Sequence, residues 1–485
     1  MKRPALRSAV AALAVLAAAG APAAGAASVT TGQQARYVLT VARTFNPASL
    51  PAGVRVEKDL TAVHALVVRA PVSEASALLG LAGVLGVSPD RPLHVTDDSS
   101  PSSGGVYAPA AVRGGAGKKG AGSGIGVAIL DTGVADTAAL SRSHDHLVSG
   151  PNFSGDTSSP RDGFGHGTFM ANLIAGGSVD GHAIGVAPGA VVTDVKVAAA
   201  NGTTNLSNVL SGMDWVAKNA SNGLRVMSMS LSATRPQDAY GRDPLTEGAD
   251  AVRNAGVVVV VSSGNDPSTI GDPAQDPYLM TVGAADTTGD SPSTAAFSGH
   301  GVVKNLIRPD VVAPGVSILS ILPPNSLIAT QHPSAAADNG LYRGSGTSQA
   351  TAVTAGAVAV FLAKHTDLTP DDVRVSFAKA AKALDGWSDG AGLITIPTSV
   401  HLASDNAAAG EGGAGTSPSS NPSPDASSWS ASSWSASSWS ASSWSASSWS
   451  ASSWSASSWS ASSWSASSWS ASSWSASSWS ASSWS

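Results

Sequence analysis

Ser348 stands where a small, turn-forming run meets a long apolar segment. The segment 348–364 predicts a buried helix, and GTSQATAVTAG (346–356) places Ser348 at its N-terminus. Backbone N–H groups without intrahelical partners and the helix macrodipole favour negative charge at such a terminus. A nucleophilic serine would benefit from both, because its attack on a carbonyl creates an oxyanion. The same position also suits a serine that only caps the helix, and this stretch alone does not separate the two.

Two further residues supply the partners that a nucleophilic serine needs. Asp131 directly follows the apolar run GIGVAIL (124–130), within the motif LDTGV. His166 lies between glycines in DGFGHGTFMANLIAG (162–176), just before a helical pattern. Acyl transfer requires a nucleophile, an imidazole that takes its proton and a carboxylate that fixes the imidazole tautomer. Asp131 and His166 therefore provide the remaining groups of a hydrolytic triad.

Asn265 adds a fourth group, because it follows a buried strand in SSGND (262–266). Its side-chain amide could donate to an oxyanion beside the backbone N–H of Ser348. Each residue alone has an ordinary explanation: Asp131 and Asn265 suit turns, and His166 could be a core or surface histidine. Their joint occurrence in one chain favours the catalytic interpretation.

Continuous apolar runs alternate with helical patterns from residue 124 onward. Such alternation predicts an α/β fold in which helices cover both faces of a mostly parallel sheet. Reactive groups in these sheets collect at the carboxyl ends of the strands, and Asp131, residues 230–232 and Asn265 fall there. The expected strands are 124–130, 190–198, 225–232 and 256–264, and the expected helices between them are 209–220 and 245–256.

The short motifs Asp-Thr-Gly, Gly-His-Gly-Thr and Gly-Thr-Ser occur in the chain order Asp, His, Ser. This order is informative, because unrelated triad folds place the three residues differently. Together the motifs closely resemble the subtilisin-like serine proteases (subtilases, peptidase S8 family) over roughly residues 120–400. The supporting stretches are IGVAPGA (184–190), SMSLS (228–232), VSSGND (261–266), TVGA (281–284) and RPDVVAPG (308–315).

The resemblance implies a serine endopeptidase that cleaves protein or peptide substrates through an acyl-enzyme. It assigns the triad to Asp131, His166 and Ser348, and the oxyanion hole to Asn265. The implied substrate-binding residues form the two walls of the specificity pocket, and one wall would pair with substrate as an added strand. These residues are Ser230, Leu231, Ser232, Gly264 and Gly271.

Several positions depart from the family pattern. Gln349 follows the nucleophile where Met is usual, and Ala352 stands in place of a Pro. Ser232 and Ala233 replace a common glycine pair, which would narrow or polarise the pocket, and a frequent second histidine after His166 is missing. These changes leave the cleavage specificity open. A degenerate, inactive copy of the enzyme is the alternative.

The N-terminal part of the chain predicts export and processing. Residues 1–27 have a basic start, an apolar core and small residues, as in a secretory signal peptide, with a retained anchor as the alternative. Residues 33–98 are expected to form a small α+β domain. By the resemblance they are an inhibitory propeptide, on the basis of YVLTV and GVLGVSPD. Residues 99–123 have the composition of a linker or processing region, which leaves 124–402 as the catalytic domain.

The C-terminal part predicts no buried core. Residues 403–425 are rich in Ala, Gly, Ser and Pro and are expected to be a linker, and 426–485 repeat Ala-Ser-Ser-Trp-Ser twelve times. A five-residue period gives Trp no constant face, so a disordered tail is expected. The alternative function is surface or cell-wall binding through the exposed Trp, with an inactive protease-like domain. A plain spacer is a third interpretation.

Charge and cysteine content limit the partners. The net charge is −6, from 27 basic and 33 acidic side chains without a like-charge block, so no nucleic-acid partner is expected. The apolar N-terminal run is too short for a stable membrane span, and an extracellular protein is expected. With no cysteine, the exported chain must hold together without disulfides. No cofactor is required, and calcium is left open because the loop 177–183 with Asp180 offers no evident ligand set.

Overall fold

The computed structural model describes residues 33–95, 105–112, 114–157, 161–233, 240–303, 306–384, 386 and 388–403. The expected signal peptide, nearly all of the expected 403–425 linker and the Trp repeats lie outside these residues. Within the described part of the chain, no helix is long and apolar enough to cross a membrane.

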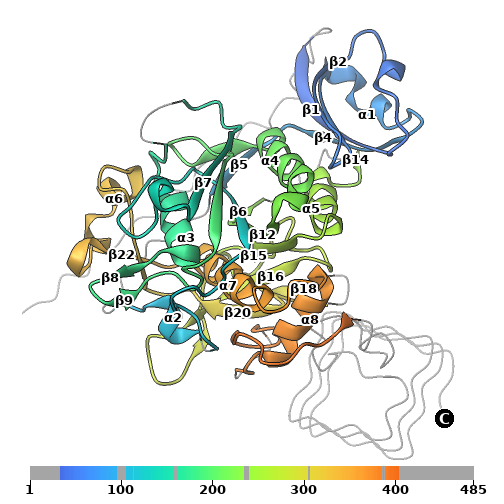
Figure 1. Cartoon of the computed structure of the whole chain (residues 1–485). Helices are drawn as coiled ribbons and strands as arrows, with labels where there is room; N and C mark the ends of the chain where they lie inside the picture. The colour runs from blue at the N-terminus through green and yellow to red at the C-terminus, as the bar shows by residue number, and fades with distance from the viewer. Residues whose placement is uncertain are drawn as a thin grey trace, which may run out of the picture.

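The larger unit is built on a sheet of eight strands in the order β17-β16-β15-β12-β6-β10-β7, with β20 also paired to β16 (Figure 1). All pairings are parallel except that of β17 with β16. This confirms the predicted mostly parallel sheet. The strands are β6 (Gly126–Asp131), β7 (Leu147–Asn152), β10 (Val191–Lys196), β12 (Leu224–Met229), β15 (Val258–Ser262), β16 (Met280–Asp286), β17 (Ser293–Thr294) and β20 (Val311–Pro314).

Helices cover both faces of this sheet, and β6 shows why. Its residues Val127 and Ile129 pack in one hydrophobic cluster, whereas Ala128 and Leu130 pack in another. The first cluster holds α3 (His166–Ala175), α7 (Thr347–Leu362) and α8 (Pro370–Ala380), and the second holds α4 (Leu206–Lys218) and α5 (Pro244–Asn254). A strand buried on both faces needs apolar side chains at every position, which explains the continuous apolar runs.

The smaller N-terminal unit is a sheet in the order β14-β4-β1-β3-β2 with a one-turn helix, α1 (Ala75–Leu78) (Figure 1). Its own strands are β1 (Gln34–Val41), β2 (Arg55–Leu60), β3 (Ala65–Pro71) and β4 (Val84–Pro89). The edge strand β14 (Tyr240–Gly241) belongs to the larger unit and pairs with β4. Val38, Val67 and neighbouring side chains share a core with α4 and α5, so the two units pack together.

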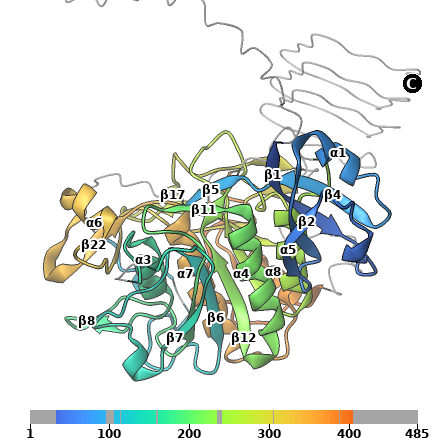
Figure 2. The ribbon, with the colours of Figure 1, turned by 90° about the horizontal axis from the view of Figure 1, so that it is seen from above.

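The larger unit also contains shorter elements, and it pairs with β5, the strand that follows the N-terminal sheet in the chain. Strand β5 (Pro92–Val95) lies beside β11 (Thr203–Asn205) (Figure 2). On its other side β5 pairs with β13 (Leu231–Ser232), and both pairings are antiparallel. The expected strand 225–232 is therefore two elements, because β12 ends at Met229 and β13 turns to a different sheet. The remaining elements are β8 (Ser178–Val179), β9 (His182–Ala183), β18 (Gly301–Val303), β19 (Leu306–Arg308), β21 (Ile318–Ser320), β22 (Tyr342–Gly344), α2 (Ala108–Ala111) and α6 (Leu327–Gln331).

The segment 99–123 is not a free linker along its whole length. Val106 donates its N–H to the carbonyl of Ser317 at 2.9 Å and accepts from the N–H of Leu319 at 2.9 Å. Ala108 and Val112 are buried in the core of the larger unit. The structured part of the larger unit thus begins about twenty residues before the expected boundary at 124, because scattered apolar residues anchor a segment whose composition suggested flexibility.

Candidate functional site

Asp131 and His166 form a buried hydrogen-bonded pair. Asp131 is the last residue of β6 and His166 the first residue of α3. The imidazole Nδ1 lies 2.8 Å from Oδ1 and 2.9 Å from Oδ2 of the carboxylate, and each residue is 1% exposed. Asp131 Oδ1 also accepts the backbone N–H of Thr132 at 2.7 Å. An ionised carboxylate can only accept, so the proton of the neutral imidazole lies on Nδ1 and Nε2 is an acceptor.

The glycines on both sides of His166 have separate structural reasons. Gly165 caps the helix in the left-handed region with φ of 104°, which L side chains rarely adopt. At Gly167 a Cβ would lie 2.1 Å from the carbonyl oxygen of Gly133, so a side chain there would push α3 away from the Asp-Thr-Gly turn. The Gly-His-Gly motif therefore brings the start of α3 close enough to β6 for the imidazole to reach Asp131.

Ser348 lies in the first turn of α7, as its second residue after the N-cap Gly346. All sixteen residues of α7 are buried, and Ser348 is 0% exposed. This confirms the buried helix that the apolar segment predicted. Because the first backbone N–H groups of a helix have no partner within it, Ser348 is placed where a negative charge is favoured.

Asn265 is fixed beside the same helix terminus. Its Oδ1 accepts the backbone N–H of Thr347 at 2.9 Å and the Thr347 hydroxyl at 2.8 Å. These two donors fix the orientation of the amide, so Nδ2 points the other way. Nδ2 is buried and has no hydrogen-bond partner among the described residues. A buried amide donor beside Ser348 with its hydrogens available is suited to an oxyanion.

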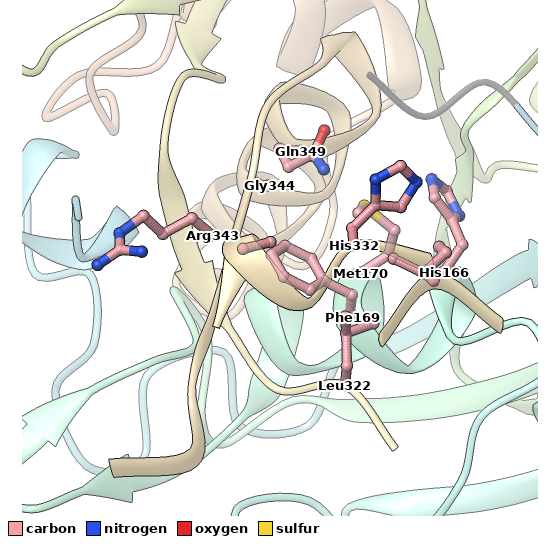
Figure 3. A pocket seen from close by; sticks show the side chains of 10 residues that line it. His166, Phe169, Met170, Leu322, His332, Arg343, Gly344 and Gln349 are labelled. Carbon is pink, nitrogen blue, oxygen red and sulfur yellow. The ribbon is translucent and has the colours of Figure 1, made fainter. Parts of the chain in front are cut away.

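The starts of α3 and α7 meet at a pocket (Figure 3). His166 and Met170 line it from α3, Gln349 lines it from α7, and His332 closes another side. Since Gln349 directly follows Ser348, this pocket brings the imidazole and the serine-bearing turn together. Gln349 is 2% exposed, and its Oε1 has no hydrogen-bond partner in the described part of the chain. The departure from the usual Met thus places an amide in the wall of this pocket.

The residues predicted for substrate binding lie on two segments near Ser348, one that leads into a short strand and one that is a loop. The Ser230 hydroxyl donates to the carbonyl of Ser348 at 3.4 Å. The next two residues, Leu231 and Ser232, form β13, which pairs with Val95 and His94 of β5. On the loop, Gly264 follows β15, and the N–H of Gly271 donates to the backbone carbonyl of Ser263 at 3.2 Å. Strand pairing at β13 is therefore already in use by a segment of the same chain.

Asp162 is a site residue that the sequence motifs contained but did not single out. It is fully buried, and its two oxygens accept from Thr132 Oγ1, Gly165 N, Thr168 N and Thr168 Oγ1 at 2.6–2.8 Å. Burial is the largest influence on its pKa and raises it, whereas the four donors lower it. Thr132 follows Asp131 and Gly165 precedes His166, so Asp162 ties the two halves of the pair together. The signal for Asp162 that the sequence offered was its position four residues before His166.

The loop with Asp180 is a tight hairpin between β8 and β9. Asp180 has φ of 47°, and its carbonyl faces His182 Nδ1 at 3.1 Å. The His182 ring stacks on Tyr107, with centroids 4.7 Å apart. Across the described ranges no group of three or more His, Asp or Glu side chains could hold a metal ion. The structure therefore adds no ligand set for calcium at this hairpin.

Comparisons with known proteins agree with this fold and arrangement. The profile of the Subtilase family (Peptidase S8) matches residues 122–412. Serine protease AprX of Bacillus subtilis (strain 168) is 33% identical over 300 residues, covering 58% of this chain and 66% of that protein. Subtilisin DY of Bacillus licheniformis is 32% identical over 281 residues, covering 57% of this chain and 90% of that protein. The chain thus spans just under two thirds of AprX and nine tenths of subtilisin DY.

A solved structure supports the fold independently. Fervidolysin from Fervidobacterium pennivorans, a keratinolytic enzyme related to subtilisin, superposes with a TM-score of 0.59 at 22% identity, covering 75% of this chain and 60% of that chain. The α/β architecture is therefore that of subtilisin. The chain belongs to the subtilase family, and the predicted class of serine-type endopeptidase is confirmed.

Proposed function

We propose that the chain hydrolyses peptide bonds of protein substrates through an acyl-enzyme on Ser348. The observation that carries this proposal is the buried Asp131–His166 pair beside the first turn of α7. In this proposal Ser348 attacks the carbonyl carbon and His166 Nε2 takes the hydroxyl proton. The carbon gains the oxygen of Ser348 and its own oxygen becomes the oxyanion.

The protonated imidazole then donates to the leaving amine, and the C–N bond breaks to leave an ester on Ser348. A water molecule repeats the sequence with His166 as base, which releases the acid and restores the hydroxyl. Asp131 stays ionised throughout. It holds the imidazole in the tautomer with the proton on Nδ1 and stabilises the imidazolium that forms in each half of the reaction.

Asn265 and the start of α7 stabilise the oxyanion in this scheme. Nδ2 of Asn265 is oriented by the two hydrogen bonds from Thr347 and needs no rearrangement when charge develops. A preorganised donor in a buried site stabilises the transition state more than a mobile one in water. The backbone N–H of Ser348, in the first turn of α7, supplies the second donor.

The N-terminal unit acts, in our proposal, as an inhibitor that is cut from the enzyme. Its support is strand β5, which pairs with β11 on one side and β13 on the other. These are the strands with which an extended substrate would pair, so β5 fills the position of substrate. Maturation then requires removal of this unit, in keeping with its expected role as a propeptide.

Export is proposed from the sequence of residues 1–27 alone. In a secreting host we expect the product to appear in the medium with a new N-terminus within 99–123. N-terminal sequencing of secreted protein, with Ser348→Ala secreted in parallel, tests this. Ser348→Ala should retain the unit at 33–95, and normal processing of that variant would refute self-cleavage.

Active-site labelling tests the catalytic proposal directly. A fluorophosphonate should attach to Ser348 of the folded, mature protein, as located by peptide mass mapping, and should block hydrolysis of casein. Ser348→Ala should neither react nor hydrolyse casein. Ser143→Ala, which removes an exposed serine, should behave as the parent. Labelling elsewhere, or casein hydrolysis by Ser348→Ala, would contradict the assignment.

A further inference from the structure

Two buried carboxylates lie at the start of strand β5 and hold one arginine. Arg91 Nη2 is 3.2 Å from Asp272 Oδ2 and 3.5 Å from Asp243 Oδ2. Arg91 is 9% exposed, Asp243 8% and Asp272 5%. No other lysine or arginine that the structure describes lies within 4 Å of either carboxylate. The arginine comes from the N-terminal unit, whereas both carboxylates belong to the larger unit.

Both carboxylates are held in place by the larger unit itself. Asp243 is the N-cap of α5, and its Oδ1 accepts the backbone N–H groups of Leu245 at 2.8 Å and Thr246 at 3.4 Å. Asp272 Oδ1 accepts the Thr246 hydroxyl at 3.0 Å. In each case the other oxygen faces the arginine. The larger unit therefore orients both carboxyl groups through contacts of its own, in addition to those with Arg91.

The backbone of Arg91 is anchored in the same way as the strand that follows it. Its carbonyl accepts the N–H of Leu206 at 3.0 Å, next to the pairing of β5 with β11. The chain continues through Leu93, which is 3% exposed, to Val95, which pairs with Leu231. Arg91 thus stands four residues before the residue opposite Leu231, on an extended segment that occupies the position of a substrate.

From this geometry we infer that Asp243 and Asp272 form an acidic subsite of the enzyme, which binds an arginine side chain of the substrate. That arginine lies four residues before the substrate residue that pairs with Leu231. The inference rests on the proposed function, because it treats β5 as occupying the substrate position. When the N-terminal unit leaves, the two carboxylates lose the cation that they bury. A substrate guanidinium at the same strand position restores the contact, since one terminal nitrogen can reach both carboxylates, as Nη2 of Arg91 does.

Competition between two matched peptides and a protein substrate tests the inference. One peptide has the sequence of residues 88–103, and the other has citrulline at the position of Arg91. Citrulline keeps the shape of arginine but has no charge. Each peptide competes with fluorescent casein for the mature enzyme made from the full chain. The arginine peptide should inhibit about ten- to a hundredfold more strongly, as expected for hydrogen bonds between charged groups.

Variants of the carboxylates show where the preference arises. Asp272→Asn and Asp243→Asn should each reduce the ratio of the two inhibition constants to about 1–3. The second variant keeps a capping side chain on α5, since Asn is also a good N-cap. Glu247→Gln, which removes a carboxylate of α5 that pairs with Arg242 instead, should retain the full ratio. Fluorophosphonate titration gives the concentration of folded active sites in every preparation.

The outcomes separate this inference from the proposed function. Equal inhibition by the two peptides, with normal casein hydrolysis, would overturn the subsite and leave the protease intact. The carboxylate pair would then serve only to hold the N-terminal unit. Absence of inhibition by both peptides would overturn the assigned strand register. Absence of both casein hydrolysis and Ser348 labelling would overturn the proposed function itself and the inference with it.

Discussion

Asp162→Asn tests how the two halves of the Asp131–His166 pair are held together. Oδ1 of Asp162 accepts from Thr132 Oγ1 and Gly165 N, and Oδ2 accepts from both the N–H and the hydroxyl of Thr168. An amide has only one oxygen. Whichever way the asparagine turns, its NH₂ group faces a backbone N–H that cannot rotate away.

The cost follows from the number of bonds that are lost. Two of the four hydrogen bonds to a charged acceptor disappear, and each contributes about 1.5–3 kcal/mol. We therefore expect Asp162→Asn to lower the free energy of unfolding by about 3–6 kcal/mol, a large part of the typical total of about 5–15 kcal/mol. Because Thr132 and Gly165 adjoin Asp131 and His166, kcat should fall as well.

Urea unfolding followed by circular dichroism measures the loss. The Ser348→Ala background prevents self-digestion in both the parent and the variant. Asp145→Asn is the matched control: Asp145 is exposed, and its φ of 59° suits asparagine equally well. That control should change the free energy of unfolding by less than about 0.5 kcal/mol.

Equal stability of Asp162→Asn and its parent would refute the reasoning. A protonated carboxyl and an amide present the same pattern of one donor group and one acceptor oxygen, so a neutral Asp162 would tolerate the change. Burial raises the pKa of Asp162 despite the four donors, which lower it. The experiment therefore also reports the charge of Asp162.

Three further changes have defined outcomes. Asn265→Leu should lower kcat on a peptide substrate about 10²–10³-fold with little change in KM, which is the loss known for such a donor in a subtilisin. An unchanged kcat would exclude Asn265 from the oxyanion hole. Burial and Asp243 raise the pKa of Asp272 from 3.8 to about 7, so between these values the native chain holds a proton that the unfolded chain has released. The stability of the uncut Ser348→Ala chain, measured as Tm, should therefore fall as pH rises across this window. Asp272→Asn in the same background should flatten that fall. An identical pH profile of Tm in both proteins would contradict the link between Asp272 and stability. Thr369→Ala removes the capping box of α8 and should lower the free energy of unfolding by about 1 kcal/mol without changing kcat, while Thr369→Ser should retain the parent's urea midpoint.

The sequence was sufficient for the fold class and for the elements that carry the candidate triad. Asp131 ends β6 and Ser348 begins α7 within one or two residues of expectation, because an apolar strand and a buried helix both have strong local patterns. The catalytic roles of these residues stay predictions until they are labelled or substituted.

What the sequence did not predict depends on contacts between distant residues. Strand β2 was missed because RVEKDL is largely exposed and charged, so it has no apolar alternation to detect. Arg91 meets Asp243 and Asp272 across 152 and 181 positions of the chain, a pairing that no local pattern encodes. Asp162 was not singled out, because Asp beside Gly is common in turns and the four groups that it accepts from converge only after folding.

The sheet of the N-terminal unit ends on β14, a strand that the larger unit supplies, and β5 in turn is a strand inside a sheet of the larger unit. Each unit therefore contributes one strand to a sheet of the other. A cut in the chain after β5 would remove the covalent link but none of these backbone hydrogen bonds. In the proposed maturation, cleavage of the chain and activation of the enzyme are therefore separate events, and activation also requires the shared sheets to part. Agents that compete for the pairing of β5 should then change how quickly a cleaved molecule becomes active.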